Sequence, residues 1–225
     1  MTNFAFMRKK LLRFEDNALA DNVIEKGKPL HDKIKGQWHT HFGNNHPITL
    51  ELGCGRGTYT VALAKRYPKQ NFIGVDLKGS RLWAGSQQAM LDNLRNVAFL
   101  RTDIAFLTDF FDPQEVAHIY LTFPDPHPTH KGVNRRLTSP RFLALYQQLL
   151  PPQGSLHLKT DNADLLTYTR ETLSQSAFQL GTMVEDVYAD LPEEDIQRQI
   201  QTPYEKRFLA EGKTIKYLNA SLSPA

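Results

Sequence analysis

Short apolar runs alternate with stretches of helical periodicity along most of the chain. From residue 47 onward the apolar runs are ITLEL, NFIGVDL, VAFLRTD, VAHIYLTF and GSLHLKTD, which is typical of strands buried in a parallel sheet. Between them apolar residues recur at helical spacing, as in Tyr59, Ala62 and Leu63, which predicts helices that pack one face on that sheet. This alternation predicts a doubly wound α/β fold rather than a β-sandwich or a helical bundle.

The C-terminal part of the chain continues the pattern with a different ending. A helix is predicted over residues 163–176, followed by two strand-like segments, FQLGTMVEDVYA and KTIKYLNASL, which are separated by an acidic stretch containing proline. The sheet is therefore expected to be mostly parallel with a C-terminal antiparallel strand. Residues 47–225 are predicted to form one domain, and residues 1–46 a basic N-terminal arm with a lead-in helix.

Composition narrows the class of protein. The chain has 225 residues, of which 40% are hydrophobic and 23% charged, as in ordinary globular proteins. It has no apolar run long enough to span a membrane and no secretory signal pattern at its start, so a cytoplasmic protein is expected. Cys54 is the single cysteine, which excludes an internal disulfide and gives no sign of a metal site. We expect Cys54 to fill space in a loop rather than act as a nucleophile.

Charge is distributed unevenly although the net charge is only +3. Residues 1–14 and 126–160 contain basic residues and no acid, whereas residues 171–197 contain acidic residues and no Lys or Arg. One face is therefore predicted to be basic and another acidic. Charge alone fits a solvated surface as well as a nucleic-acid-binding one.

A glycine-rich loop, ELGCGRG, follows the first apolar run and precedes a helix. Gly53, Gly55 and Gly57 leave room for a ligand to approach the backbone. A dinucleotide fingerprint requires glycine where this chain has Thr58, and the negative charge of Glu51 suits a cationic sulfonium better than a pyrophosphate. The loop therefore favours S-adenosylmethionine over NAD, and a methyltransferase over an NAD-dependent oxidoreductase.

Further carboxylates follow the next three strands. Asp76 can accept hydrogen bonds from ribose hydroxyls, and Asp103 lies within reach of an adenine edge. Asp125 stands between Pro124 and Pro126, which restrict its orientation, at the strand end where open α/β sheets bind ligands. Each carboxylate alone also fits an ordinary role as a helix cap, a turn residue or a strand-end charge. The stretch HPTHKGVNRR that follows offers phosphate-binding capacity without any acid.

The ordered set ELGCGRG, IGVDLKG, LRTDIA, FPDP, NRRLTSPRFL, LKTDN and TPYEKRF resembles the tRNA (guanine-N7-)-methyltransferase family. The likeness runs from roughly residue 35 to the C-terminal strand. It implies a Rossmann-like class I methyltransferase that transfers a methyl group from S-adenosylmethionine to N7 of guanine at position 46 of the tRNA variable loop. It also implies tRNA as the partner, no metal and no membrane, and a monomer or homodimer.

The resemblance assigns roles to individual residues. Asp125 and Asp161 are implied to be catalytic, by positioning the guanine rather than removing a proton. The residues implied to bind S-adenosylmethionine are Glu51, Gly53, Gly55, Gly57, Asp76, Asp103 and Asp125. The residues implied to bind the tRNA substrate are Thr129, Lys131, Arg135, Arg136, Asp161, Thr202, Tyr204 and Glu205.

One segment departs from the family pattern. The family often has D-P-W-x-K after its active-site aspartate, whereas this chain has DPHPT from Asp125 to Thr129, so an aromatic residue and a cation are replaced. Two alternatives remain at this point: a class I methyltransferase acting on another RNA, a small molecule or an exocyclic amine, and an RNA-binding relative without catalysis.

Overall fold

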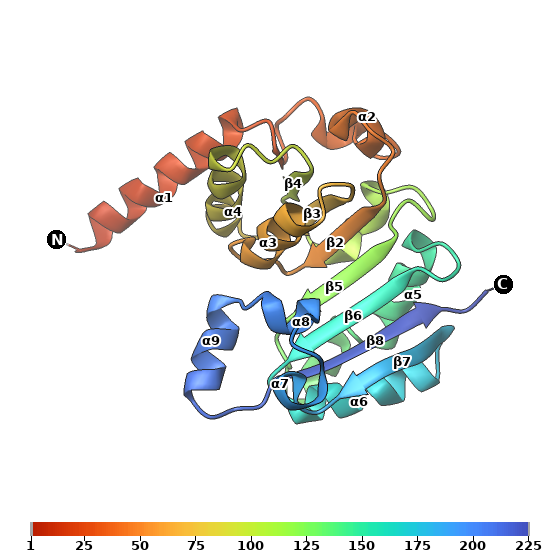
Figure 1. The fold of residues 1–225 in the computed structure, drawn as a ribbon. Helices are drawn as coiled ribbons and strands as arrows, with labels where there is room; N and C mark the ends of the chain where they lie inside the picture. The colour runs from red at the N-terminus through yellow and green to blue at the C-terminus, as the bar shows by residue number, and fades with distance from the viewer. Residues whose placement is uncertain (1, 225) are drawn as a thin grey trace. The chain divides into compact units, whose positions relative to one another are not determined.

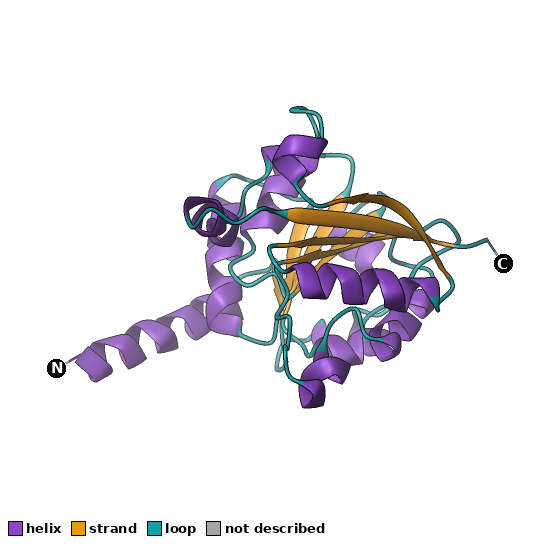
Figure 2. Cartoon of the chain, turned by 90° about the horizontal axis from the view of Figure 1, so that it is seen from below, coloured by secondary structure: helices purple, strands orange, loops and turns teal. Residues whose placement is uncertain are grey.

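The computed structural model describes residues 2–224, with side chains from residue 11 onward, and the chain divides into two compact units. The N-terminal unit comprises Met1–Phe110 and the C-terminal unit Phe111–Ala225. Strands and helices alternate through both (Figures 1 and 2). Among the described residues, no helix is long and apolar enough to cross a membrane.

The N-terminal unit is built on four parallel strands. In their order of pairing, they are β1 (Val23–Ile24), β4 (Val97–Leu100), β3 (Asn71–Val75) and β2 (Ile48–Leu52). Every residue of these strands is buried, which explains their continuous apolar character. The three longer strands confirm the predicted ones. The helices of this unit are α1 (Thr2–Leu19), η1 (His31–Lys33), α2 (Trp38–Phe42), α3 (Thr58–Arg66), α4 (Gly79–Leu91) and η2 (Ile104–Asp109).

Helix α1, within the predicted N-terminal arm, packs against α4. The Asn17 side chain donates to the Gly79 carbonyl at 2.8 Å, and Trp83 Nε1 donates to Asp16 Oδ2 at 2.7 Å. The Arg13 guanidinium lies 4.9 Å from the centre of the Trp83 ring. These contacts fix the C-terminal end of α1 to α4. The three other basic residues of the stretch 1–14, Arg8, Lys9 and Lys10, lie outside the described side chains.

The C-terminal unit contains a mixed sheet. Its strands pair in the order β5 (His118–Thr122), β6 (Ser155–Thr160), β8 (Lys216–Leu222) and β7 (Phe178–Val184). Strands β5 and β6 are parallel, whereas β8 is antiparallel to both β6 and β7. The predicted α/β class, with a C-terminal antiparallel strand, is confirmed. The helices are η3 (His130–Arg135), α5 (Pro140–Leu149), α6 (Ala163–Ser174), α7 (Val187–Asp190), α8 (Ile196–Gln199) and α9 (Pro203–Ala210).

The two faces formed by the strands of the C-terminal unit differ in chemistry. Leu156, Leu158 and Leu218 are buried on one face. The opposite face carries hydrogen bonds that link three strands: Ser155 Oγ lies 2.8 Å from His118 Nδ1 and 2.7 Å from His157 Nε2. His157 Nδ1 lies 2.7 Å from the Tyr217 hydroxyl. Burial, with a smaller contribution from the His118 charge, lowers the pKa of His157 to about 3.

Candidate functional site

The glycine loop between β2 and α3 turns sharply. Gly53 and Cys54 both donate their backbone N–H to the Val75 carbonyl, at 2.8 and 3.1 Å, so the loop folds back over the end of β3. Gly55 has a left-handed φ of +59°, and a Cβ added there would meet nothing within 4 Å. Gly55 therefore combines a backbone conformation that favours glycine with open space into which a ligand can approach the main chain.

Gly57 lies in a different environment although its φ of +68° is similar. A Cβ on Gly57 would lie 2.9 Å from Phe99 Cζ, closer still to Phe99 Cε1, and 3.2 Å from the Gly85 Cα. A Cβ on Gly85 would meet the same ring at 2.6 Å. Gly57, predicted from the resemblance to bind the cofactor, thus allows the start of α3 to pack tightly against Phe99 and α4.

Glu51 fixes the start of α3. Its carboxylate is 3% exposed, and Oε2 accepts hydrogen bonds from the Thr60 backbone N–H at 2.8 Å and from the Thr60 hydroxyl. A carboxylate at a helix N-terminus is stabilised by the free N–H groups there. Glu51 therefore places a negative charge beneath the glycine loop and holds the loop and helix in register.

Asp76 is brought against the glycine loop, as the sequence order suggested. Asp76 Oδ2 accepts from the Gly55 N–H at 2.9 Å, and Oδ1 accepts from the Lys78 N–H at 2.8 Å. A carboxylate oxygen has two lone pairs, so each oxygen retains capacity to accept a ligand hydroxyl. Asp103, exposed after β4, accepts from the Ala105 N–H at 3.0 Å as the N-cap of η2.

Cys54 is buried in this loop. Burial raises the pKa of its thiol well above the ordinary value, and the carboxylates of Glu51 and Asp76 raise it further. Since only the thiolate is a good nucleophile, the arrangement fits the expected space-filling role. Among the described residues, no group of His, Cys, Asp and Glu side chains is placed to hold a metal ion.

Asp125 lies in a constrained turn after β5. The side chain is 70% exposed, and its Oδ1 accepts the His127 N–H at 3.0 Å. Phe123 and His127, two residues on either side, both have left-handed φ values, +49° and +41°. Such conformations cost about 1–3 kcal/mol each in non-glycine residues and are found where the surrounding structure holds them.

Arg136 supplies part of that support. Its Nε donates to the Pro126 carbonyl at 2.9 Å, and a terminal nitrogen donates to the His127 carbonyl at 3.3 Å. The guanidinium also stacks 4.3 Å from the centre of the Tyr168 ring on α6. Arg136 therefore clamps the Asp125 turn to α6. By contrast, the predicted substrate-binding residues Thr129, Lys131 and Arg135 are exposed in or beside η3.

The remaining predicted substrate residues lie at the end of β6 and the start of α9. Asp161 Oδ2 pairs with Lys213 Nζ at 2.9 Å, and this contact raises the pKa of Lys213. Tyr204 is 50% exposed. Thr202 and Glu205 form a capping box, in which each side chain accepts the backbone N–H of the other.

The structure adds residues that the sequence reasoning missed. Lys159 and Lys213 contact the predicted residues Glu205 and Asp161, respectively. The sequence reasoning also missed the capping box, although the T-x-x-E spacing of Thr202 and Glu205 is a recognisable signal of one. Lys159 gave a weaker signal, a lysine directly after the alternating leucines Leu156 and Leu158 of the strand segment.

Comparisons with known proteins agree with this architecture. Residues 45–218 match the family model described as "Putative methyltransferase". The chain is 48% identical to a tRNA (guanine-N(7)-)-methyltransferase of Porphyromonas gingivalis, over 88% of this chain and 79% of the relative. It is 41% identical to one of Cytophaga hutchinsonii, over 96% of this chain and 99% of the relative.

Solved structures show the same fold at low sequence identity. The 16S rRNA methyltransferase KamB superposes with a TM-score of 0.64 and 15% identity, over 90% of this chain and 99% of that chain. A 16S rRNA (adenine(1408)-N(1))-methyltransferase from Catenulisporales acidiphilia with cosubstrate SAM gives a TM-score of 0.58 at 13% identity, over 84% of this chain and 91% of that chain. The predicted Rossmann-like methyltransferase fold is thereby confirmed.

Proposed function

The chain belongs to the tRNA (guanine-N(7)-)-methyltransferase family, and we propose that it transfers a methyl group from S-adenosylmethionine to N7 of guanine at position 46 of tRNA. The reaction takes place in the cytoplasm, with the enzyme as a monomer or homodimer. The observation that carries this proposal is the likeness, over 88% and 96% of the chain, to two curated relatives named tRNA (guanine-N(7)-)-methyltransferase.

The loop in the N-terminal unit fits S-adenosylmethionine. The open space at Gly55 admits a ligand to the backbone, and Asp76 beside it retains acceptor capacity for the ribose hydroxyls. Glu51 adds negative charge that favours a sulfonium, and Asp103 offers an acceptor toward the adenine. When bound, S-adenosylmethionine supplies a methyl group on a positively charged sulfur.

The chemistry at guanine requires no base. N7 carries an in-plane lone pair and no hydrogen, so no proton would have to leave beforehand; the N7–carbon bond would form as the bond between that carbon and the cofactor sulfur breaks. The enzyme's task is alignment, which contributes on the order of 7–11 kcal/mol when reactants are well oriented. Asp125 and Asp161 accept hydrogen bonds from the guanine N–H groups and stabilise the positive charge that the purine gains.

The two adjacent arginines are expected to affect tRNA binding differently. Arg135→Ala should reduce the slope of log affinity against log salt by about one, because an exposed arginine contacts a phosphate and releases a counterion. Arg136→Ala should leave this slope nearly unchanged and lower the methyl-transfer rate, because Arg136 is engaged with the Asp125 turn. Filter binding across a salt series and single-turnover rates measure both. Equal slopes for Arg135→Ala and wild type would place the RNA elsewhere.

The proposed function is tested by incubating the protein with an unmodified tRNA transcript and methyl-labelled S-adenosylmethionine. Label is expected at N7 of the variable-loop guanosine, located by nuclease digestion and by cleavage specific for N7-methylguanine. A transcript with adenosine at position 46 is the matched control. Label on another nucleotide or on ribosomal RNA would indicate a different substrate, and tRNA binding without label would indicate a non-catalytic relative.

A further inference from the structure

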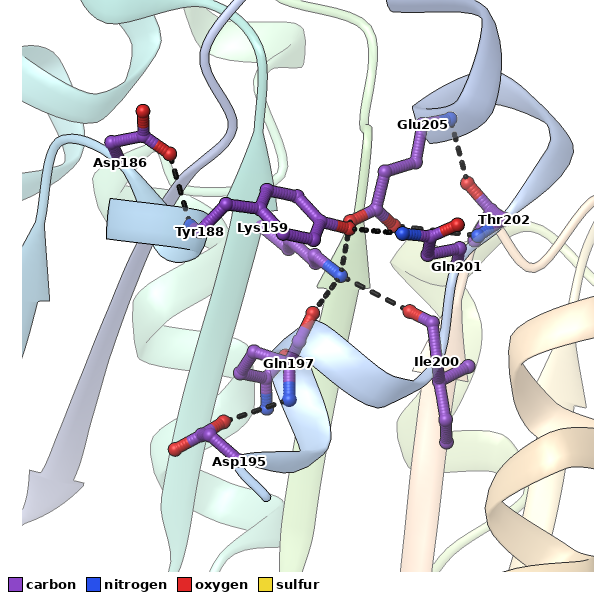
Figure 3. Close-up of polar contacts among 9 residues, drawn as sticks. All are labelled: Lys159, Asp186, Tyr188, Asp195, Gln197, Ile200, Gln201, Thr202 and Glu205. Carbon is purple, nitrogen blue, oxygen red and sulfur yellow. Dashed lines mark hydrogen bonds and ion pairs between the residues drawn. The ribbon is translucent and has the colours of Figure 1, made fainter. Parts of the chain in front are cut away.

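Lys159 is a buried lysine, and its side-chain ammonium group contacts the segment of residues 197–205 (Figure 3). It stands near the end of β6, two residues before Asp161, and is 2% exposed. Its Nζ pairs with Glu205 Oε1 at 2.7 Å and donates to the carbonyls of Ile200, at 3.1 Å, and Gln197. An ammonium group has three hydrogens, and these acceptors span α8, the loop after it and α9.

Glu205 is equally engaged from the other side of the contact. It is 0% exposed, and its Oε1 also accepts from the Tyr188 hydroxyl at 2.7 Å. Oε2 accepts from the Thr202 N–H at 3.3 Å, and the Tyr188 hydroxyl accepts from Gln201 Nε2 at 2.9 Å. Residues from α7, from the loop after α8 and from α9 therefore meet at one carboxylate, which Lys159 joins to β6 (Figure 3).

Burying this ion pair has an energetic cost. Desolvation lowers the pKa of Lys159, and the charge and hydrogen bond of Glu205 raise it in opposition. Buried ion pairs are often no more stabilising than apolar residues of similar volume, although removal of one partner is strongly destabilising. The segment also packs apolar side chains, among them Val187, Phe208 and Leu209, into a hydrophobic cluster with Ile215 and Tyr217. The ion pair adds a directional contact, which fixes this segment of short helices at a defined position on β6.

We propose that Lys159 is a positioning residue for the guanine-binding side of the enzyme, holding the start of α9, with Thr202 and Tyr204, in place relative to Asp161 at the end of β6. This inference rests on the proposed function. It also gives Glu205 an indirect role, because its carboxylate, buried among Lys159, Tyr188 and Thr202, acts through Lys159 and not by contact with guanine.

The test compares Lys159→Met, the double variant Lys159→Met/Glu205→Gln, and the control Lys206→Met on the exposed surface of α9. Lys159→Met is expected to lower the single-turnover methyl-transfer rate about 100-fold, the loss that a ~1 Å misplacement can cause. The Kd for S-adenosylmethionine should stay at the wild-type value, because the proposed cofactor residues Glu51, Asp76 and Asp103 are unaltered. Lys206→Met should match wild type in both.

The double variant separates positioning from stability. It removes both charges and keeps an amide that can cap α9, so it should regain thermal stability relative to Lys159→Met while its transfer rate stays low. Recovery of the wild-type rate in the double variant, or an unchanged rate in Lys159→Met, would overturn the proposal. If Lys159→Met does not fold, the single-turnover rate is measured in the double variant and in Tyr188→Phe, which removes one hydrogen bond to Glu205. Rates below wild type in both would support the positioning role, and wild-type rates in both would overturn it.

Hydrogen exchange supplies a readout that does not depend on catalysis. Amides of residues 197–210 should exchange faster in the Lys159 variants than in Lys206→Met, while those of β5 and β6 stay protected. Unchanged exchange in 197–210 would contradict the anchoring role. Faster exchange together with a wild-type protein that leaves tRNA unmethylated would instead refute the proposed function and retain the anchor.

Discussion

Replacing Gly57 with alanine is expected to lower the free energy of unfolding by about 2–4 kcal/mol, because overpacking and a left-handed conformation are combined at one residue. The added Cβ would lie 2.9 Å from Phe99 Cζ and 3.2 Å from the Gly85 Cα, with φ at +68°. The Phe99 ring is buried and lacks room to retreat. Chemical denaturation of the wild-type protein and of Gly57→Ala measures the difference in free energy of unfolding.

Gly55→Ala provides the matched control. Its φ is also left-handed, at +59°, but its Cβ would meet nothing within 4 Å, so we expect a loss of about 1 kcal/mol in stability. Its methyl group would project into the space proposed for the ligand, and affinity for S-adenosylmethionine should fall about tenfold, or ~1.4 kcal/mol. Calorimetric titration measures this affinity. Equal stabilities for the two variants would show that the Phe99 contact is relieved by local movement.

Replacing Asp161 with asparagine is expected to lower the single-turnover methyl-transfer rate about 100-fold, the effect typical of removing one preorganised electrostatic contact to a developing charge. The variant keeps the shape of the side chain and loses its negative charge. Affinity for S-adenosylmethionine should not change, since the proposed cofactor residues lie on β2 or in segments that follow β2, β3, β4 and β5. Rapid-quench single-turnover assays at saturating tRNA, with calorimetry for the cofactor, separate the two quantities.

Lys213→Met is the control for Asp161, because it removes the cation paired at 2.9 Å and leaves the carboxylate in place. We expect it to reduce the rate much less than Asp161→Asn does. Equal losses in the two variants would mean that Asp161 acts only as the partner of Lys213. An unchanged rate in Asp161→Asn would remove Asp161 from the catalytic site.

The sequence predicted the longer strands well because each contains an apolar run that can be recognised from local sequence alone. The five runs beginning with ITLEL correspond to β2, β3, β4, β5 and β6. Strand β1 was missed since Val23–Ile24 is too short to show any periodicity. The strand predicted from FQLGTMVEDVYA was too long: β7 ends at Val184, and the last three residues of that segment begin α7. Helix α8 was missed. Both helices have only four residues, and the contacts that stabilise them come from distant residues such as Ile215 and Lys159.

The sequence predicted which strand each candidate site residue follows, but it did not predict the side-chain contacts of each residue. The alignment of Asp76 with Gly55 follows from parallel strands ending at one edge, which a sequence can indicate. The packing of Gly57 on Phe99 and the burial of Glu205 against Lys159 depend on side chains far away in sequence. Motif spacing carries no information about such volumes and ion pairs, and the ligand-binding roles that the resemblance implies for Gly57 and Glu205 stay predictions.

The hydrogen-bonded chain across β5, β6 and β8 bears on how the kinetics of this protein are interpreted. With its pKa lowered to about 3, His157 is neutral throughout the pH range in which tRNA methylation is ordinarily assayed. Burial also lowers the pKa of His118 at the other end of the chain. A group that keeps one protonation state contributes no limb to a pH–rate profile. A limb near neutral pH therefore reports an ionisation outside His157, either elsewhere in the protein or in the RNA.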